Sequence, residues 1–166
     1  MAAPNLQTRE ETAPAELAER YRAVRAHTHR LCEPLEIEDY VVSSMPDVSP
    51  TKWHLAHTSW FFETFVLAHR IPGYQPLDPK YAFLFNSYYV QAGERHCRAQ
   101  RGLVTRPTVH EVMEYRAYVD ERMLALLDGI DEDETVTLGL HHEQQHQELM
   151  LTDIKHVFWT NPVHPA

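Results

Sequence analysis

Apolar residues recur at helical spacing in four stretches of the chain. Between residues 14 and 33, side chains that can face a core fall three or four positions apart, which predicts an amphipathic helix: Leu17, Tyr21, Val24, Thr28 and Leu31. Pro34 ends this helix, because proline cannot continue it. Ser49 followed by Pro50 has the pattern of an N-cap and a first helical residue, and it predicts a second helix that runs to about Arg70.

The second half of the chain predicts two further helices. Thr108 and Glu111 have the spacing of a capping box, which begins a third helix that reaches about Asp128 and is followed by a glycine. A fourth helix is predicted from residue 134 to residue 159, where an Asn-Pro pair ends it.

Residues 72–106 join the second and third helices and differ from both. They contain aromatic residues followed by a run of arginines: Tyr81, Phe83, Phe85, Tyr88, Tyr89, Arg95, Arg98, Arg101 and Arg106. Such a connection is usually functional or disordered, and its aromatic content argues against disorder, so we expect an ordered loop with one short helix. Four helices with one long crossover between the second and third predict an all-α four-helix bundle; the alternative is an irregular helical domain completed by a partner.

Length and composition fit one soluble domain. The 166 residues suffice for a single core, which we expect over residues 13–160 after a frayed terminus at 1–12. The net charge of −9 argues against nucleic acid or an anionic membrane as the partner. The sequence has no signal-peptide pattern, no run of about 18 apolar residues and only two cysteines, so we expect a protein of the reducing cytoplasm.

Histidine is unusually frequent, with 12 residues, and two of them lie four positions apart in the predicted fourth helix. This spacing places His142 and His146 on one helix face, about 5–6 Å apart at Cβ, where two imidazoles can share a metal ion. Leu149 and Asp153 continue that face, whereas His141 points away from it. Because many such pairs are merely solvated or buried in a core, a metal site needs a third ligand from elsewhere.

The second helix offers that ligand. His57 lies in the middle of a stripe of residues on the helical wheel, with His54 at its edge: Trp53, Trp60, Phe61, Thr64 and Ala68. A histidine among buried aromatic residues must have its nitrogens satisfied, either by a carbonyl group or by a metal. Together with the facing pair, it favours a metal site formed by His57, His142 and His146. Three neutral nitrogen ligands suit iron, zinc, copper or nickel and leave coordination positions open.

The same segment, His142-Glu143-Gln-Gln-His146, also has the spelling of the zinc-protease motif, in which the glutamate is the general base. Proteases of this class usually have a further ligand downstream. The glycine and histidine of the metzincin form are replaced here by Leu149 and Thr152, and no glutamate follows Glu148. Zinc proteolysis is therefore the weaker interpretation.

Longer motifs occur in a fixed order from about residue 40 onward: Ser49-Pro-Thr-Lys-Trp-His-Leu-Ala-His57, Phe85-Asn-Ser-Tyr-Tyr89, Glu94-Arg-His-Cys-Arg98, Arg101-Gly-Leu-Val-Thr-Arg-Pro-Thr-Val109, His142-Glu-Gln-Gln-His-Gln-Glu-Leu149 and Thr152-Asp-Ile154. In this combination they resemble the ergothioneine-biosynthesis sulfoxide synthases, which are oxygen-dependent non-haem iron enzymes. The combination is more specific than any one motif.

The resemblance implies a DinB-like helical bundle joined to a C-terminal domain similar to formylglycine-generating enzymes. It implies Fe(II) held by three bundle histidines at the positions of His57, His142 and His146. The reaction of the family joins the sulfur of cysteine or gamma-glutamylcysteine to C2 of the imidazole of hercynine (trimethylhistidine), and it oxidises that sulfur with O2 to a sulfoxide. Residues 161–166 would then begin the linker to the C-terminal domain, which this sequence does not contain.

The resemblance also implies substrate-binding residues. Arg95 and Arg98 match arginines that hold the carboxylates of the thiol, a role that suits the planar guanidinium. Gln145 matches a position that contacts hercynine, and Tyr88 and Tyr89 are candidates for the wall of the pocket. The alternatives are a solvated loop for the arginines, an ordinary surface amide for the glutamine and simple packing for the two tyrosines.

Two other functions stay open from the sequence. One is a stand-alone metal-dependent thiol transferase of the DinB-like kind, in which the metal lowers the pKa of a thiol. The other is a non-catalytic helical module that a metal stabilises, or a remnant of a larger enzyme. The sequence does not choose between the two thiol substrates.

Overall fold

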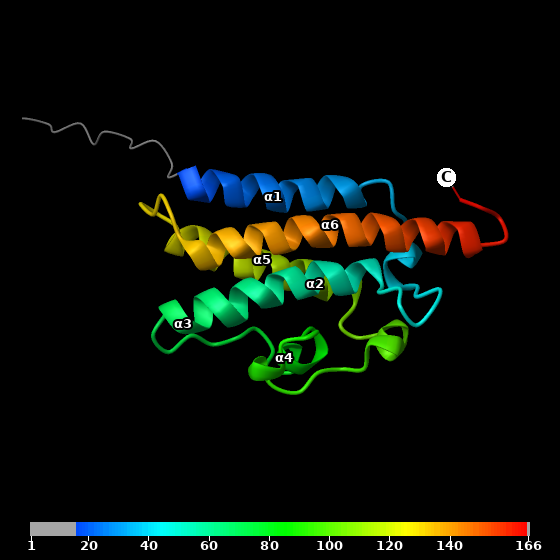
Figure 1. The fold of residues 1–166 in the computed structure, drawn as a ribbon, viewed down its shortest axis with the longest axis horizontal. Helices are drawn as coiled ribbons and strands as arrows, with labels where there is room; N and C mark the ends of the chain where they lie inside the picture. Colours follow the sequence, from blue (N-terminus) through cyan, green and yellow to red (C-terminus); the bar gives the residue numbers. More distant parts are fainter. Residues whose placement is uncertain (1–15, 166) are drawn as a thin grey trace, which may run out of the picture.

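The computed structural model describes residues 16–165, and its fold is all-α, as predicted. The expected frayed terminus at 1–12 lies outside the described residues. Four long helices run alongside one another, and the long connection between the second and third lies on one side of them (Figure 1). Within residues 16–165, no helix combines the length and the apolar composition needed to cross a membrane.

The four long helices are α1 (Glu16–Cys32), α2 (Thr51–Phe62), α5 (Val109–Leu126) and α6 (Glu134–Thr160). Helix α2 packs against α5 and α6, and α1 packs against α6. The bounds predicted for the third and fourth helices are confirmed to within two residues. A 3-10 helix, Ile37–Val41, lies in the connection between α1 and α2.

The capping box predicted at the start of α5 is confirmed. The Thr108 hydroxyl accepts a hydrogen bond from the Glu111 backbone N–H at 3.2 Å, and the Glu111 carboxylate accepts one from the Thr108 N–H at 2.6 Å. These bonds satisfy donors that a helix start would leave unpaired.

The predicted start of the second helix is wrong by one residue. The N-cap is Pro50, which has no side-chain capping bond, and the helix begins at Thr51. The Ser49 hydroxyl does not cap the helix, because it accepts a hydrogen bond from Arg101 instead, at 2.9 Å. A contact between distant segments has replaced the local one.

The second helix reaches Arg70 as predicted, but it changes geometry on the way. A π-helical turn, Glu63–Leu67, follows α2 and leads into the short α3 (Ala68–Arg70). This wider turn shifts the phase of the helix relative to its first part. The stripe predicted around His57 therefore does not continue: Thr64 is half-buried and Ala68 is exposed.

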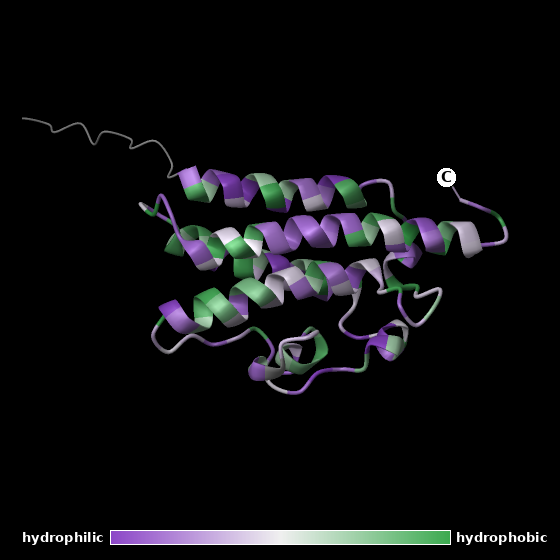
Figure 2. Ribbon diagram, viewed as in Figure 1, coloured by the Kyte–Doolittle hydropathy of each residue, from purple (hydrophilic) through white to green (hydrophobic). Residues whose placement is uncertain are grey.

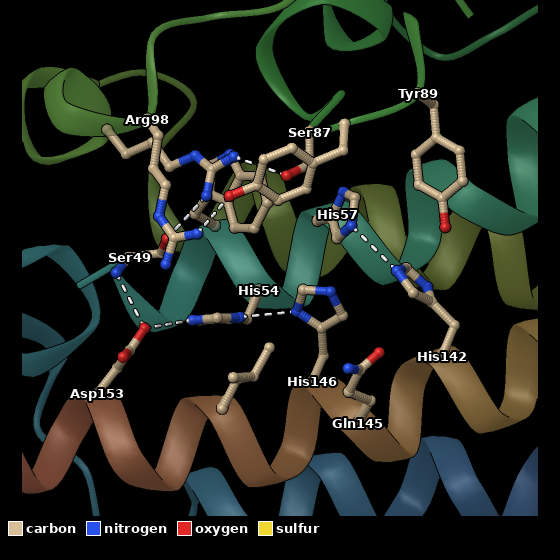
Figure 3. A pocket seen from close by; sticks show the side chains of 14 residues that line it. Ser49, His54, His57, Ser87, Tyr89, Arg98, His142, Gln145, His146 and Asp153 are labelled. Carbon is tan, nitrogen blue, oxygen red and sulfur yellow. Dashed lines mark hydrogen bonds and ion pairs between the residues drawn. The ribbon is translucent and has the colours of Figure 1, made fainter. Parts of the chain in front are cut away.

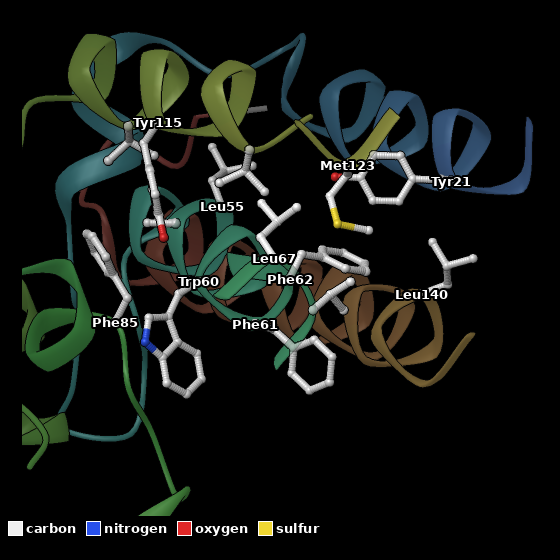
Figure 4. Packing of buried hydrophobic residues seen from close by; sticks show 14 of the residues in the cluster. Tyr21, Leu55, Trp60, Phe61, Phe62, Leu67, Phe85, Tyr115, Met123 and Leu140 are labelled. Atoms are coloured by element: carbon white, nitrogen blue, oxygen red, sulfur yellow. The ribbon is translucent and has the colours of Figure 1, made fainter. Parts of the chain in front are cut away.

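Helix α2 is the centre of the fold. All its residues are buried, so it is enclosed on every side and not along one stripe only. Side chains from α2, α5, α6 and the long connection interlock around it (Figure 4): Leu55, Trp60, Phe61, Phe62, Phe85, Tyr115, Met123 and Leu140. Gly139 permits the close approach of α6, because a Cβ atom there would lie 2.5 Å from Cε1 of Phe62.

The long connection is more structured than predicted. It contains one short α-helix, α4 (Tyr81–Leu84), as expected, and also two 3-10 helices, Val90–Ala92 and Arg98–Leu103. The connection is anchored from within: the Asn86 side-chain amide donates hydrogen bonds to the backbone carbonyls of Tyr89 and Gly93, at 3.2 and 3.1 Å.

The middle of α6 is strongly hydrophilic, although it lies between α1 and α2 (Figures 1 and 2). Polar groups enclosed by neighbouring helices need specific partners, since an unsatisfied buried group is costly. The partners of this segment define the candidate site.

Candidate metal centre

Three histidines from two helices converge at one point. His57 comes from α2 and is 1% exposed, and His142 and His146 come from successive turns of α6. Each offers one ring nitrogen, and these nitrogens all lie within 4.8 Å of one another (Figure 3). The three histidines could therefore hold one metal ion.

The His57 ring is fixed in position and in tautomer. It lies between the rings of Trp53 and Trp60, nearly parallel to both, with centroid distances of 4.5 and 5.4 Å. Its Nδ1 donates a hydrogen bond to the backbone carbonyl of Phe85. Because a carbonyl oxygen only accepts, Nδ1 carries the proton and Nε2 keeps a free lone pair. That Nε2 lies 3.1 Å from Nε2 of His142.

His142 and His146 present their rings to the same point. The centroid of each lies within 5 Å of His57, at 4.9 and 4.6 Å. Nδ1 of His142 is buried and has no hydrogen-bond partner in the described part of the chain. Nδ1 of His146 lies 2.9 Å from Nδ1 of His54, a residue that the helical wheel placed only at the edge of the stripe. His54 is in fact buried, at 4% exposure.

Burial keeps the three rings in their neutral form. It lowers the pKa of His57 well below the usual value, with the neighbouring His142 adding to the effect. It lowers the pKa of His142 to about 4. The pKa of His146 is also strongly lowered, by burial first and then by the adjacent His57 ring. Neutral imidazole is the form that binds a metal ion.

The histidines form one wall of a cavity of about 220 Å³. The long connection supplies the facing wall, and Figure 3 shows Tyr89, Ser87 and Arg98 on that side. Gln145 lines the cavity next to His146, and the two residues predicted to continue the ligand face, Leu149 and Asp153, line it as well.

The two arginines singled out in the sequence have different surroundings. Arg98 lines the cavity, and its guanidinium donates to the hydroxyl of Tyr88 and to the carbonyl of Asp47, both at 2.6 Å. Arg95 is not among the lining residues. It donates to the Ser87 carbonyl at 2.7 Å, and its guanidinium lies 5.4 Å from the centroid of the Tyr88 ring. Arg95 therefore supports the wall from behind.

Arg101 is a cavity residue that the sequence argument did not select. It is 4% exposed, and its guanidinium carbon lies 3.3 Å from the centroid of the Trp53 ring. Its terminal nitrogens donate to the hydroxyls of Ser49 and Ser87, and Nε has no partner among the described residues. Burial and the nearby Arg98 lower the pKa of Arg101 to about 10. The sequence showed it as one arginine in a basic run, and that pattern gives no sign of burial.

Glu143, the would-be base of the protease motif, points away from the histidines. It is fully buried among α1, α5 and α6, and its carboxylate accepts bonds from Arg25 at 2.9 Å and Arg116 at 3.0 Å. Thr28 donates a further bond at 2.6 Å. Burial alone would raise the pKa of Glu143, but the two arginines lower it to about 2. This carboxylate forms ion pairs inside the core and does not face the histidines, which argues against a role as the base of a zinc protease.

The neighbouring polar residues fit the predicted helix faces. His141 and Glu148 are exposed, as the wheel placed them away from the ligand face.

Both cysteines are free thiols, with Cys32 buried and Cys97 exposed.

Comparison with known proteins addresses the fold and not the reaction. No curated protein matches the sequence significantly. The family described as the DinB superfamily matches residues 20–158, a span that includes the three histidines and all four long helices except their outermost turns. The chain belongs to the DinB superfamily.

Proposed function

We propose that this chain is the iron-binding domain of an oxygen-dependent sulfoxide synthase that joins a cysteine-type thiol to hercynine in the cytoplasm. The observation that carries the proposal is the cavity in which three neutral histidines face two arginines that lack an acidic partner. None of the ion pairs within residues 16–165 involves Arg98 or Arg101. Such a cavity suits a metal and an anionic substrate together.

The donor set fits Fe(II). His57, His142 and His146 would hold it, and three protein ligands leave positions open for substrate and oxygen. Bound iron would supply the activation of oxygen, which the side chains of the cavity cannot supply themselves. The role of this chain's own side chains is to hold the metal and to position the two substrates.

The thiol substrate is an amino acid or a short peptide, so it brings at least one carboxylate. In this proposal Arg98 and Arg101 bind that carboxylate, because both line the cavity and a planar guanidinium matches it. Arg95 acts indirectly by holding the Ser87 carbonyl, and hence the loop that carries the cavity wall. Placing an anion beside Arg101 would also satisfy a buried cation that otherwise has only neutral partners.

Hercynine carries a trimethylammonium group and an imidazole. Aromatic faces attract quaternary ammonium groups, and Tyr88 and Tyr89 supply such faces at the cavity. The Gln145 amide lines the same cavity and would donate to or accept from the substrate imidazole. In this proposal both substrates bind in the same cavity, so that the imidazole and the thiol would lie beside each other.

The overall reaction balances with oxygen as the only oxidant. One S–H bond of the thiol and the C2–H bond of hercynine are lost, and a C–S bond is formed. One oxygen atom ends on sulfur as the sulfoxide, and the other leaves as water with the two hydrogens. No further reductant is required.

The first test is titration of the metal-free chain with Fe(II) in the absence of oxygen, in parallel with His57→Ala. The proposal expects one equivalent of tight binding that the variant loses. His141→Ala is the matched control, because His141 is an exposed histidine next to the proposed ligand. Weak binding, or binding that His57→Ala leaves intact, would contradict the site.

The second test measures oxygen uptake with hercynine and either cysteine or gamma-glutamylcysteine. It is run with the chain alone and with a formylglycine-generating-enzyme-like domain of a sulfoxide synthase added as a partner. Uptake that needs both substrates, with the sulfoxide as product, supports the proposal. Metal-dependent consumption of a thiol without oxygen uptake would instead indicate a thiol transferase, and metal binding without turnover in any combination would indicate a structural module.

A further inference from the structure

We propose that Asp153 and His54 form a hydrogen-bonded chain that fixes the tautomer of His146 and so aims its Nε2 at the metal position. This inference rests on the proposed metal site, and it assigns positioning roles to two residues outside the ligand set. The three side chains come from α2 and α6 and lie in one line along the cavity floor in Figure 3.

The hydrogen-bonded chain starts at the Asp153 carboxylate. Its Oδ2 accepts a hydrogen bond from the Ser49 backbone N–H at 2.9 Å, which holds the carboxylate at the start of α2. The same Oδ2 lies 3.0 Å from Nε2 of His54. A carboxylate oxygen accepts, so His54 must carry a proton on Nε2.

The second bond follows from the first. His54 is buried, and a neutral imidazole has one N–H, which here is used on Asp153, so Nδ1 of this ring is left as an acceptor. Nδ1 of His54 lies 2.9 Å from Nδ1 of His146. Two bare nitrogens would repel at this distance, so His146 donates from Nδ1. Its Nε2 then keeps a free lone pair on the side of His57 and His142.

The negative charge of the Asp153 carboxylate, at the end of the hydrogen-bonded chain, has a second consequence. A metal ion withdraws electrons from a bound imidazole and makes its remaining N–H more acidic. Hydrogen bonding of that N–H, through His54, to a carboxylate opposes this effect and makes His146 a stronger ligand. The other two histidines lack such support, since His57 donates to a neutral carbonyl and His142 Nδ1 has no partner among residues 16–165.

The tautomers can be read without any metal. In metal-free protein labelled with ¹⁵N-histidine, long-range ¹H–¹⁵N correlations at mildly alkaline pH should show His146 protonated on Nδ1 and His54 protonated on Nε2. Asp153→Ala should convert both rings to mixtures of tautomers. Finding His146 protonated on Nε2 in the parent protein overturns the proposal, and this measurement does not depend on whether any variant folds.

Metal affinity supplies the second readout, with Zn²⁺ as a redox-inert probe competing against a chromophoric chelator. His54→Leu breaks the hydrogen-bonded chain and should weaken zinc binding about 10- to 100-fold. His54→Asn places an amide oxygen near the position of Nδ1, so it should restore most of the affinity. His141→Leu, on the exposed face of α6, should leave the affinity unchanged. Circular dichroism confirms that each variant is folded.

The outcomes separate this inference from the proposed function. If the parent protein does not bind zinc, or binds it as well after His57→Ala, then the metal site itself is wrong. If His57→Ala abolishes binding but His54→Leu binds as tightly as the parent, then only the positioning role is wrong. Equal losses of affinity in His54→Leu and His54→Asn would also contradict the positioning role. Such a result would mean that the hydrogen-bond acceptor at position 54 does not matter and that only the packing of His54 does.

Discussion

Replacing Glu143 by glutamine is the sharpest test of how this fold is held together. The carboxylate of Glu143 is the shared partner of two buried guanidinium groups, Arg25 and Arg116, with distances of 2.9 and 3.0 Å. An amide is nearly the same size, so the substitution removes the charge and leaves the packing. Removing one partner from a buried ion pair costs about 3–5 kcal/mol, because the remaining charge stays buried. Arg25 keeps a second ion pair, with Asp120 at 2.7 Å, so the cation left without an anion is Arg116.

For a chain of this size, each kcal/mol corresponds to about 2–4 °C in Tm. Glu143→Gln should therefore lower Tm by about 6–20 °C in a thermal melt followed by circular dichroism. The matched control is Glu148→Gln, which makes the same chemical change at an exposed position of α6 and should shift Tm very little.

The loss should also depend on pH. The arginines outweigh the effect of burial and hold the folded-state pKa of Glu143 at about 2, below its usual 4.5. A lowered folded-state pKa gives a contribution that is present above pH 4.5 and is lost as the pH falls toward 2. The gap between the parent and Glu143→Gln should therefore be widest near neutral pH and should narrow in acid.

Two results would refute this reasoning. A Tm for Glu143→Gln that equals that of Glu148→Gln would mean that the two guanidinium groups do not depend on the carboxylate. A variant that keeps its stability but loses a metal-dependent hydrolysis would revive the protease interpretation, in which Glu143 is a base and not part of the core.

Three further predictions concern other parts of the chain. Gly139→Ala should lower both Tm and zinc affinity, because a methyl group 2.5 Å from the Phe62 ring must push α6 away from α2. Overpacking of this kind costs about 1–3 kcal/mol. A thermal melt measures the loss of stability, and a zinc titration measures the loss of affinity. Thr108→Ala should cost about 1 kcal/mol in urea unfolding by removing the N-cap of α5, and Thr108→Ser should restore it. Exposed Cys97 should react with DTNB as a free thiol, whereas Cys32, whose pKa burial raises to about 11, should react only on unfolding; equal rates would contradict this.

Local sequence determines much of this fold and of the candidate site. The limits of α5 and α6 could be predicted because capping residues and Asn-Pro pairs act within a few positions. The ligand face of α6 could be predicted for the same reason, since helical periodicity alone places His142, His146, Leu149 and Asp153 in one row. All four line the cavity.

What could not be predicted depends on contacts between distant segments. The π-turn after α2 includes Glu63, whose carboxylate accepts hydrogen bonds from Tyr74 and Tyr115, and nothing in the local pattern indicates these partners. The burial of Arg101 depends on Ser49 and the Trp53 ring at the start of α2, and on Ser87 in the long connection. Periodicity gives the direction in which a side chain points from its own helix, but it does not identify the residues that the side chain contacts.

The two sides of α6 explain how a polar helix can lie inside a bundle and still present ligands. One side carries Glu143 and Gln147, which are buried against α1; the Gln147 amide donates to the Val24 carbonyl at 3.0 Å and to the Thr28 hydroxyl at 2.9 Å. These bonds are directional, so they fix the rotation of α6 about its axis more narrowly than apolar packing would. Because the candidate metal ligands His142 and His146 are the immediate sequence neighbours of Glu143 and Gln147, the same rotation aims them at α2. Glu143, which resembles the base of a protease motif, and Gln147 thus set the geometry of the histidine cluster from the opposite side of α6.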